Sequence, residues 1–203
     1  MAMATVMLVA AGLVGGAGSA EAAPAVSGTG YLACSATTGK VKMSPGLGTV
    51  AAAGLRSFTA KLTLACDGGS NPAYSVGSGK ATLTFSEPAT RTCATLPQTF
   101  GYTGSAVLTV KFKASGAKLN PTRIVFPSHS STEYPPTGQE FWGFAGDADL
   151  NAAVITGSYA GEDADFTIRS LRTVIDLQST CTAKGYKTLA LGHAGMEISA
   201  TPF

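Results

Sequence analysis

The segment Val107–Ala114 has the sequence VLTVKFKA, in which apolar and polar side chains alternate from Leu108 onward. Successive side chains of a β-strand point to opposite faces of its sheet, so this period of two predicts a strand with one buried face and one hydrated face. The predicted buried face comprises Leu108, Val110, Phe112 and Ala114, and the hydrated face comprises Thr109, Lys111 and Lys113.

The same alternation predicts a strand over Phe58–Cys66 and another that buries Ala81, Leu83 and Phe85. Turn residues such as Asp67-Gly68-Gly69 and Ser115-Gly116 separate the apolar runs, and helical signal is confined to Val50–Leu55 and Leu171–Ser179. We therefore predict an all-β fold, a single-domain antiparallel β-sandwich or partly closed β-barrel with two disulfides. Further strands are predicted over Arg123–Phe126, Phe141–Phe144, Ala153–Gly157, Phe166–Val174 and Lys187–Leu191.

The N-terminus has the pattern of a secretory signal peptide. An apolar run over Val6–Val14 is too short to span a bilayer and leads to the cleavage motif Ala20-Glu21-Ala22. We predict a signal peptide over residues 1–22 and a secreted domain over residues 23–203 that has no membrane anchor after cleavage.

Charge along the predicted domain is low and nearly balanced. The formal net charge of the whole chain is +2, and removal of Glu21 with the leader raises it to +3. Lys and Arg are scattered along the sequence, whereas a nucleic-acid or anionic-membrane surface needs a basic patch. We therefore predict no nucleic-acid partner.

The chain contains 4 cysteines, and all of them follow the predicted cleavage site. An even number of cysteines behind a signal peptide indicates disulfides, whereas a zinc site would need paired C-x-x-C spacing or nearby histidines. Three pairings are possible. We favour Cys34–Cys66 and Cys93–Cys181, because each bridge then joins segments that are predicted as strands.

Several short motifs occur in a fixed order. Cys34 leads into Ser44-Pro45-Gly46-Leu47, and Leu64-Ala65-Cys66-Asp67-Gly68, Cys93, Phe144-Ala145-Gly146-Asp147 and Cys181 follow. This layout, C…SPGL…LxCxG…C…FxGD…C, resembles a family of small secreted β-proteins of actinobacteria. The resemblance covers most of the predicted mature chain. It implies export, disulfides and β-structure, and it supplies no activity and no catalytic residues.

Signals for catalysis and for metal binding are weak. Ala73-Tyr74-Ser75-Val76-Gly77 approximates the nucleophile elbow of α/β-hydrolases, with His193 later in the chain, but no helix is predicted after Ser75, so a glycine-rich hairpin loop is the preferred interpretation. His129 and His193 are interpreted as surface residues, the latter in a turn. Asp147, Asp149 and Asn151 resemble the start of a calcium loop, which Glu162, Asp163 or Asp165 would have to complete, but solvated turn acids are the preferred interpretation. We predict no catalytic residue, no metal and no cofactor.

The most suggestive group of residues lies between Tyr134 and Asp147 and combines aromatic, amide and carboxylate side chains. Exposed aromatic rings beside amides and carboxylates suit stacking on sugars, although Trp142 is also a candidate for the centre of the core. A glycosidase would further need two close carboxylates, for which Glu133 and Glu140 are conceivable. We predict a secreted, extracellular, non-catalytic module that binds a glycan or a protein, with a secreted glycan- or ester-cleaving hydrolase as the alternative. The predicted ligand site comprises Tyr134, Gln139, Glu140, Trp142 and Asp147.

Overall fold

The computed structural model describes residues 30–69, 74–95, 100–101, 104–127, 130–131, 139–145 and 153–200, with the backbone only for 100–101, 130–131 and 139–145. The predicted leader lies outside these residues. The described part consists almost entirely of antiparallel strands, which confirms the all-β prediction. None of its helices has the length and apolar character needed to cross a bilayer.

The strands are β1 (Leu32–Ala36), β2 (Gly39–Leu47), β3 (Leu55–Gly68), β4 (Ser75–Pro88), β5 (Phe100–Gly101), β6 (Ala106–Ser115), β7 (Thr122–Phe126), β8 (Ser130–Ser131), β9 (Gln139–Ala145), β10 (Val154–Thr156), β11 (Asp163–Thr173) and β12 (Tyr186–Ser199), and the helices are η1 (Cys93–Thr95) and α1 (Val174–Ser179).

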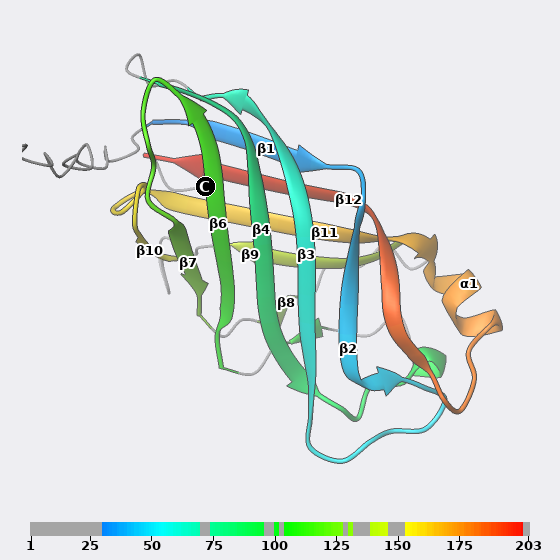
Figure 1. The fold of residues 1–203 in the computed structure, drawn as a ribbon. Helices are drawn as coiled ribbons and strands as arrows, with labels where there is room; N and C mark the ends of the chain where they lie inside the picture. Colours follow the sequence, from blue (N-terminus) through cyan, green and yellow to red (C-terminus); the bar gives the residue numbers. More distant parts are fainter. Residues whose placement is uncertain are drawn as a thin grey trace, which may run out of the picture.

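Within the described residues the main sheet has ten strands in the order β10-β7-β6-β4-β3-β1-β12-β11-β9, and β2 pairs with both β3 and β12. β5 and β8 form a separate pair. In Figure 1, β6, β4, β3 and β2 form a front layer, and β1, β11 and β9 run across them in a second layer behind. Strands that pass between crossing layers are typical of orthogonal sandwiches and partly closed barrels.

The sheet turns from one layer into the other along β1–β2 and β12. β1 and β2 lie end to end, and both are paired with β3 on one side and with β12 on the other. β12 changes direction opposite the break, where Gly192 is an extra residue between the partners of Arg169 and Ser170. A Cβ atom at Gly192 would lie 3.2 Å from the Cα of Leu171, so the bulge leaves little space for a side chain.

The core lies between the two layers and is built from the alternation seen in the sequence. The predicted buried side chains of β3 and β4 are buried, except that Cys66 is half-buried, and the stacked rings of Phe58 and Phe85, with centroids 4.4 Å apart, lie at paired positions of the two strands. On β6, Leu108 and Val110 are fully buried, while Phe112 and Ala114 are half-buried. The outward positions of the same strands carry mainly Thr, Lys and Ser.

Three local predictions are wrong. Residues 50–54 form no helix, and Leu55 already belongs to β3. Ser75 lies at the start of β4 rather than in a hairpin loop, because it pairs with Ser115 at the end of β6. His193 lies inside β12 rather than in a turn, because the Gly192 bulge lets the strand continue through the glycine-rich segment. The helix predicted over Leu171–Ser179 begins only at Val174, because β11 continues to Thr173. Thr173 caps the helix, since its side chain accepts a hydrogen bond from the N–H of Asp176.

Both predicted disulfides are present, Cys34–Cys66 and Cys93–Cys181. The first joins directly paired positions of β1 and β3. The second joins η1 to the residues that follow α1, so the expectation that each bridge connects two strands is correct only for the first. The two bridges thus connect cysteines that are 32 and 88 residues apart in the sequence.

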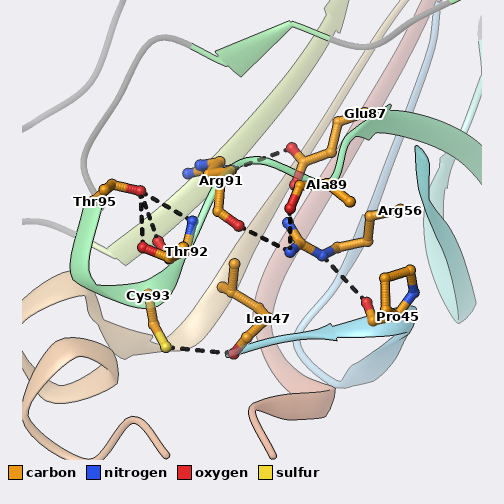
Figure 2. Close-up of polar contacts among 9 residues, drawn as sticks. All are labelled: Pro45, Leu47, Arg56, Glu87, Ala89, Arg91, Thr92, Cys93 and Thr95. Carbon is orange, nitrogen blue, oxygen red and sulfur yellow. Dashed lines mark hydrogen bonds and ion pairs between the residues drawn. The ribbon is translucent and has the colours of Figure 1, made fainter. Parts of the chain in front are cut away.

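A buried ionic cluster lies at the start of β3, at the end of the strand opposite Cys66. Arg56 is fully buried, and its Nη1 lies 2.7 Å from Oε1 of Glu87, its directly paired residue on β4. Figure 2 shows the Arg56 guanidinium surrounded by acceptors: its Nε donates to the carbonyl of Pro45 at 3.2 Å and its Nη2 to that of Arg91 at 2.8 Å. Arg91 approaches the second Glu87 oxygen at 3.5 Å. Because Arg56, Glu87 and Arg91 are buried, a shift of the β3–β4 register would leave unpaired charges in the core.

We expect Glu87→Gln to lower the free energy of unfolding by about 3–5 kcal/mol, because it leaves buried guanidinium groups without their counter-ion. Urea-induced unfolding measures this loss. Asp176→Asn is the matched control: it breaks the more exposed pair between Arg172 and Asp176, and pairs of that kind contribute only about 0–1 kcal/mol. Equal losses in the two variants would contradict the role given to the buried cluster.

Candidate functional site

The predicted aromatic ligand site falls largely on residues that the structure does not describe. Tyr134 and Asp147 lie outside the described residues, as do Glu133, His129, Asp149 and Asn151. Gln139, Glu140 and Trp142 belong to β9, where the backbone of Trp142 pairs with Ile168 of β11, but their side chains are outside the description. The site therefore stays a prediction.

Ser75 and His193 are not brought together. Ser75 lines a hollow at the outer ends of β4 and β6, together with Gly77, Ser78 and Lys113. His193 lines a different hollow, on β1, β11 and β12. The geometry gives no support to a Ser–His hydrolase.

The hollow that contains His193 is acidic. It has a volume of about 560 Å³ on the outer surface of β1, β12 and β11, and three carboxylates surround it. Asp165 and Glu197 are directly paired across β11 and β12. Asp67 comes from the end of β3, where its Oδ1 accepts hydrogen bonds from the N–H of Ala33 at 3.3 Å and of Gly69 at 3.0 Å. Small and hydroxyl-bearing residues complete the lining, among them Ala33, Ser35, Ala65, Thr167 and Gly195.

The pKa values of two groups at this acidic hollow, Asp165 and the nearby Tyr31, are raised. Burial raises the pKa of the Asp165 carboxyl, and the charges of Glu197 and Asp163 raise it further, against a lowering hydrogen bond from the backbone of Phe166. Loss of hydration raises the pKa of the nearby Tyr31 phenol, and Glu197, followed by Asp67, adds to this shift. Like charges directly opposite one another destabilise a sheet, so the pairing of Asp165 with Glu197 is unfavourable unless a proton or a ligand neutralises it.

A second surface with polar side chains covers the outside of the front layer. Strand register places Arg123, Thr109, Thr82, Lys61 and Lys40 in one continuous row across β7, β6, β4, β3 and β2. Neighbouring rows contribute further lysines and threonines. We call this surface the Lys/Thr face and define it by Lys40, Lys42, Thr59, Lys61, Thr63, Lys80, Thr82, Thr84, Thr109, Lys111, Lys113 and Arg123.

The cations of the Lys/Thr face are exposed and lack acidic partners among the described residues. The face carries half of the chain's 14 Lys and Arg residues, and none of these seven forms an ion pair with a described acid. Lys40 is directly opposite Lys61, and Lys80 is directly opposite Lys111. A hollow of about 440 Å³ lies over β2 and β3, lined by Thr38, Gly39, Lys40, Lys42, Thr59 and Lys61.

The prediction that basic residues are scattered is therefore wrong for the folded chain. They are dispersed in sequence because each strand places a cation at only one or two of its outward positions. The registers of successive strands then align these positions. The signal available in the sequence was the repeated K-x-T, T-x-K and K-x-K spacing, in 40–42, 59–61, 80–82 and 109–113, which places every polar member on the same face of its strand.

No group of three His, Cys, Asp or Glu side chains in the described part of the chain is arranged to hold a metal ion. No family model, no curated protein and no solved structure matches the chain. The resemblance to secreted actinobacterial β-proteins thus stays a prediction, and the function has to be inferred from the two polar surfaces themselves.

We expect Glu197→Gln to lower the pKa of Asp165, while the remaining burial keeps it above the ordinary aspartate value. The folded protein holds this proton to higher pH than the unfolded chain. Stability is therefore lost as the pH rises from the ordinary aspartate pKa through the raised one, and the variant loses less. Carboxyl carbon NMR titration of both proteins measures the shift, and an unchanged pKa of Asp165 would contradict the coupling.

Proposed function

We propose that the protein is a secreted, non-catalytic module that binds an anionic polymer of the cell envelope through the Lys/Thr face. The observation that carries the proposal is that two pairs of lysines stand directly opposite one another on neighbouring strands, Lys40 with Lys61 and Lys80 with Lys111. Like charges directly opposite one another lower the stability of a sheet. Edge strands use lysine to prevent sheet-to-sheet association, but β3 and β4 are interior strands, so that explanation does not apply to Lys61 and Lys80.

An anionic polymer would supply the negative charges that the Lys/Thr face lacks. It places negative groups beside cations that have no acidic partner among the described residues, and threonine hydroxyls can donate hydrogen bonds to its oxygen atoms. The acidic hollow carries Asp67, Asp165 and Glu197, which repel such a ligand. The charge distribution therefore favours binding to the Lys/Thr face rather than to the acidic hollow, although the net charge is small.

The extracellular setting rests on the predicted leader over residues 1–22 and on the two disulfides, which persist in oxidising compartments. Nucleic acid is a less favourable ligand. Proteins that bind single strands combine cations with aromatic platforms for the bases, and no described side chain pointing outward from β2, β3, β4, β6 or β7 is aromatic. The predicted aromatic site at residues 134–147 is a separate proposal for glycan binding.

Lys61→Thr and Lys80→Thr test the proposal, because they replace each cation by the residue type of its neighbours. We expect each variant to bind a polyanion more weakly and, at low salt, to unfold with a free energy about 0.2–1 kcal/mol higher than the parent protein. The gain in stability arises from removal of repulsion and should shrink at high salt, where exposed charges are screened. Calorimetric titration with a phosphate-rich polymer and thermal unfolding provide the two measurements.

Glu197→Gln is the control for this experiment, since it removes a charge from the acidic hollow, outside the Lys/Thr face, and should not weaken binding. Reduced stability of Lys61→Thr together with unchanged binding would show that the lysines serve the fold. That result would end the proposal.

One observation favours a second function, glycan hydrolysis in the acidic hollow. Asp165 and Glu197 are directly paired, and such residues have Cβ atoms about 4.5–5.5 Å apart, so their side chains can bring the two carboxyl groups to the roughly 5–5.5 Å separation of retaining glycosidases. Asp165, with its raised pKa, would protonate the leaving oxygen, and Glu197 would attack the anomeric carbon. Water would then release the sugar from Glu197 and return the proton to Asp165.

Incubation with envelope glycans, followed by detection of new reducing ends, tests this second function. Hydrolysis that disappears in both Asp165→Asn and Glu197→Gln, while Lys61→Thr retains it, would establish it. The absence of new reducing ends with the parent protein across the acidic pH range would exclude it for those glycans, without affecting the proposal for the Lys/Thr face.

A further inference from the structure

The cations of the Lys/Thr face are arranged across the strands rather than along them. β3 and β4 each contribute a single outward lysine, Lys61 and Lys80, and β7 contributes only Arg123. A linear ligand that followed any one strand would therefore meet at most two cations. A ligand that crossed the strands would meet Lys40, Lys61 and Arg123 in one row, with Lys80 of β4 and Lys111 of β6 two residues away along their strands.

We infer that the ligand is a flexible phosphodiester-linked polymer without stacking bases, and that it lies across the strands from Lys40 to Arg123. This inference rests on the proposed function and specifies its ligand. Neighbouring strands are about 4.8 Å apart, and four such steps separate β2 from β7, so the ligand must extend over roughly 19 Å to contact the whole row.

The composition of the face is suited to phosphodiester groups. Six of the cations are lysines and one is arginine. Arginine presents a planar fork that matches both carboxylates and phosphates, whereas the lysine ammonium binds phosphates as a point charge with freely directed donors. A phosphodiester carries a single delocalised charge that a point charge can neutralise from several directions. Thr59, Thr82 and Thr109 lie between the cations and offer hydroxyl donors to the remaining oxygens.

One end of the row is suited to hold a phosphate group more firmly than the rest. Lys40, Lys42 and Lys61 surround the 440 Å³ hollow, and Thr38 and Thr59 line it. Three cations from two adjacent strands thus converge on one concave place. At the opposite end Arg123 stands on the short strand β7, beside Thr109 and Thr156. The hollow is the first point of attachment, and Arg123 is reached only by longer chains.

Synthetic glycerol phosphate oligomers of graded length test the inference in the full-length secreted protein. We expect affinity to rise with length until the chain spans roughly 19 Å and to rise much less beyond it. Arg123→Gln should weaken binding of long oligomers by roughly threefold or more at low salt and leave short oligomers unchanged. Lys40→Gln should weaken oligomers of every length. Lys184→Gln, in the turn between α1 and β12, is the control and should weaken none.

Several outcomes would overturn the inference and remain distinguishable from failure of the proposed function. Binding of long oligomers that is insensitive to Arg123→Gln would mean that the ligand does not cross the strands. Tighter binding of a sulfated glycan, of a polycarboxylate or of single-stranded DNA with equal charge would assign a different ligand class to the same face. Only the absence of binding to all of these polyanions would remove the proposed function itself.

Discussion

Arg56 and Glu87 face each other across β3 and β4 as a fully buried ion pair, and the positions of all other strands in the front layer depend on this register. A shift of two residues would keep the same faces inward but would leave buried charges without partners. The Cys34–Cys66 bridge fixes the opposite end of β3 to β1. With both ends of β3 fixed, the outward residues of β2, β4 and β6 have defined neighbours.

This fixed register explains how a chain with few charges acquires two surfaces of opposite sign. Within the front layer, cations fall beside cations, as where Lys40 stands directly opposite Lys61. In the second layer, Asp165 and Glu197 are brought together in the same way. Both arrangements work against folding, and the core and the disulfides have to offset them. Arrangements that lower stability are expected mainly at functional sites, so the Lys/Thr face and the acidic hollow are the candidates for function.

The sequence contained enough information for the fold class but not for the site. Alternation in Val107–Ala114 and Phe58–Cys66 predicts strands correctly, since one face of each must be buried. It does not predict which strands are neighbours, so Lys61 and Lys40 appear unrelated until their register is known. The strand at His193 was missed because a bulge at Gly192 allows pairing in a glycine-rich segment. The buried position of Arg56 was likewise hidden, because its partner Glu87 is 31 residues away.

The central claim is that the Lys/Thr face, and no other surface, binds an anionic polymer. Amide NMR spectra of the assigned protein, recorded during titration with glycerol phosphate oligomers, test it most directly. The account predicts that chemical-shift changes centre on residues 40–42, 59–63, 80–84, 109–113 and 123, and leave those of the acidic hollow, 165–167 and 193–197, unchanged. Changes centred on the acidic hollow or on residues 134–147, with the Lys/Thr face unaffected, would contradict it.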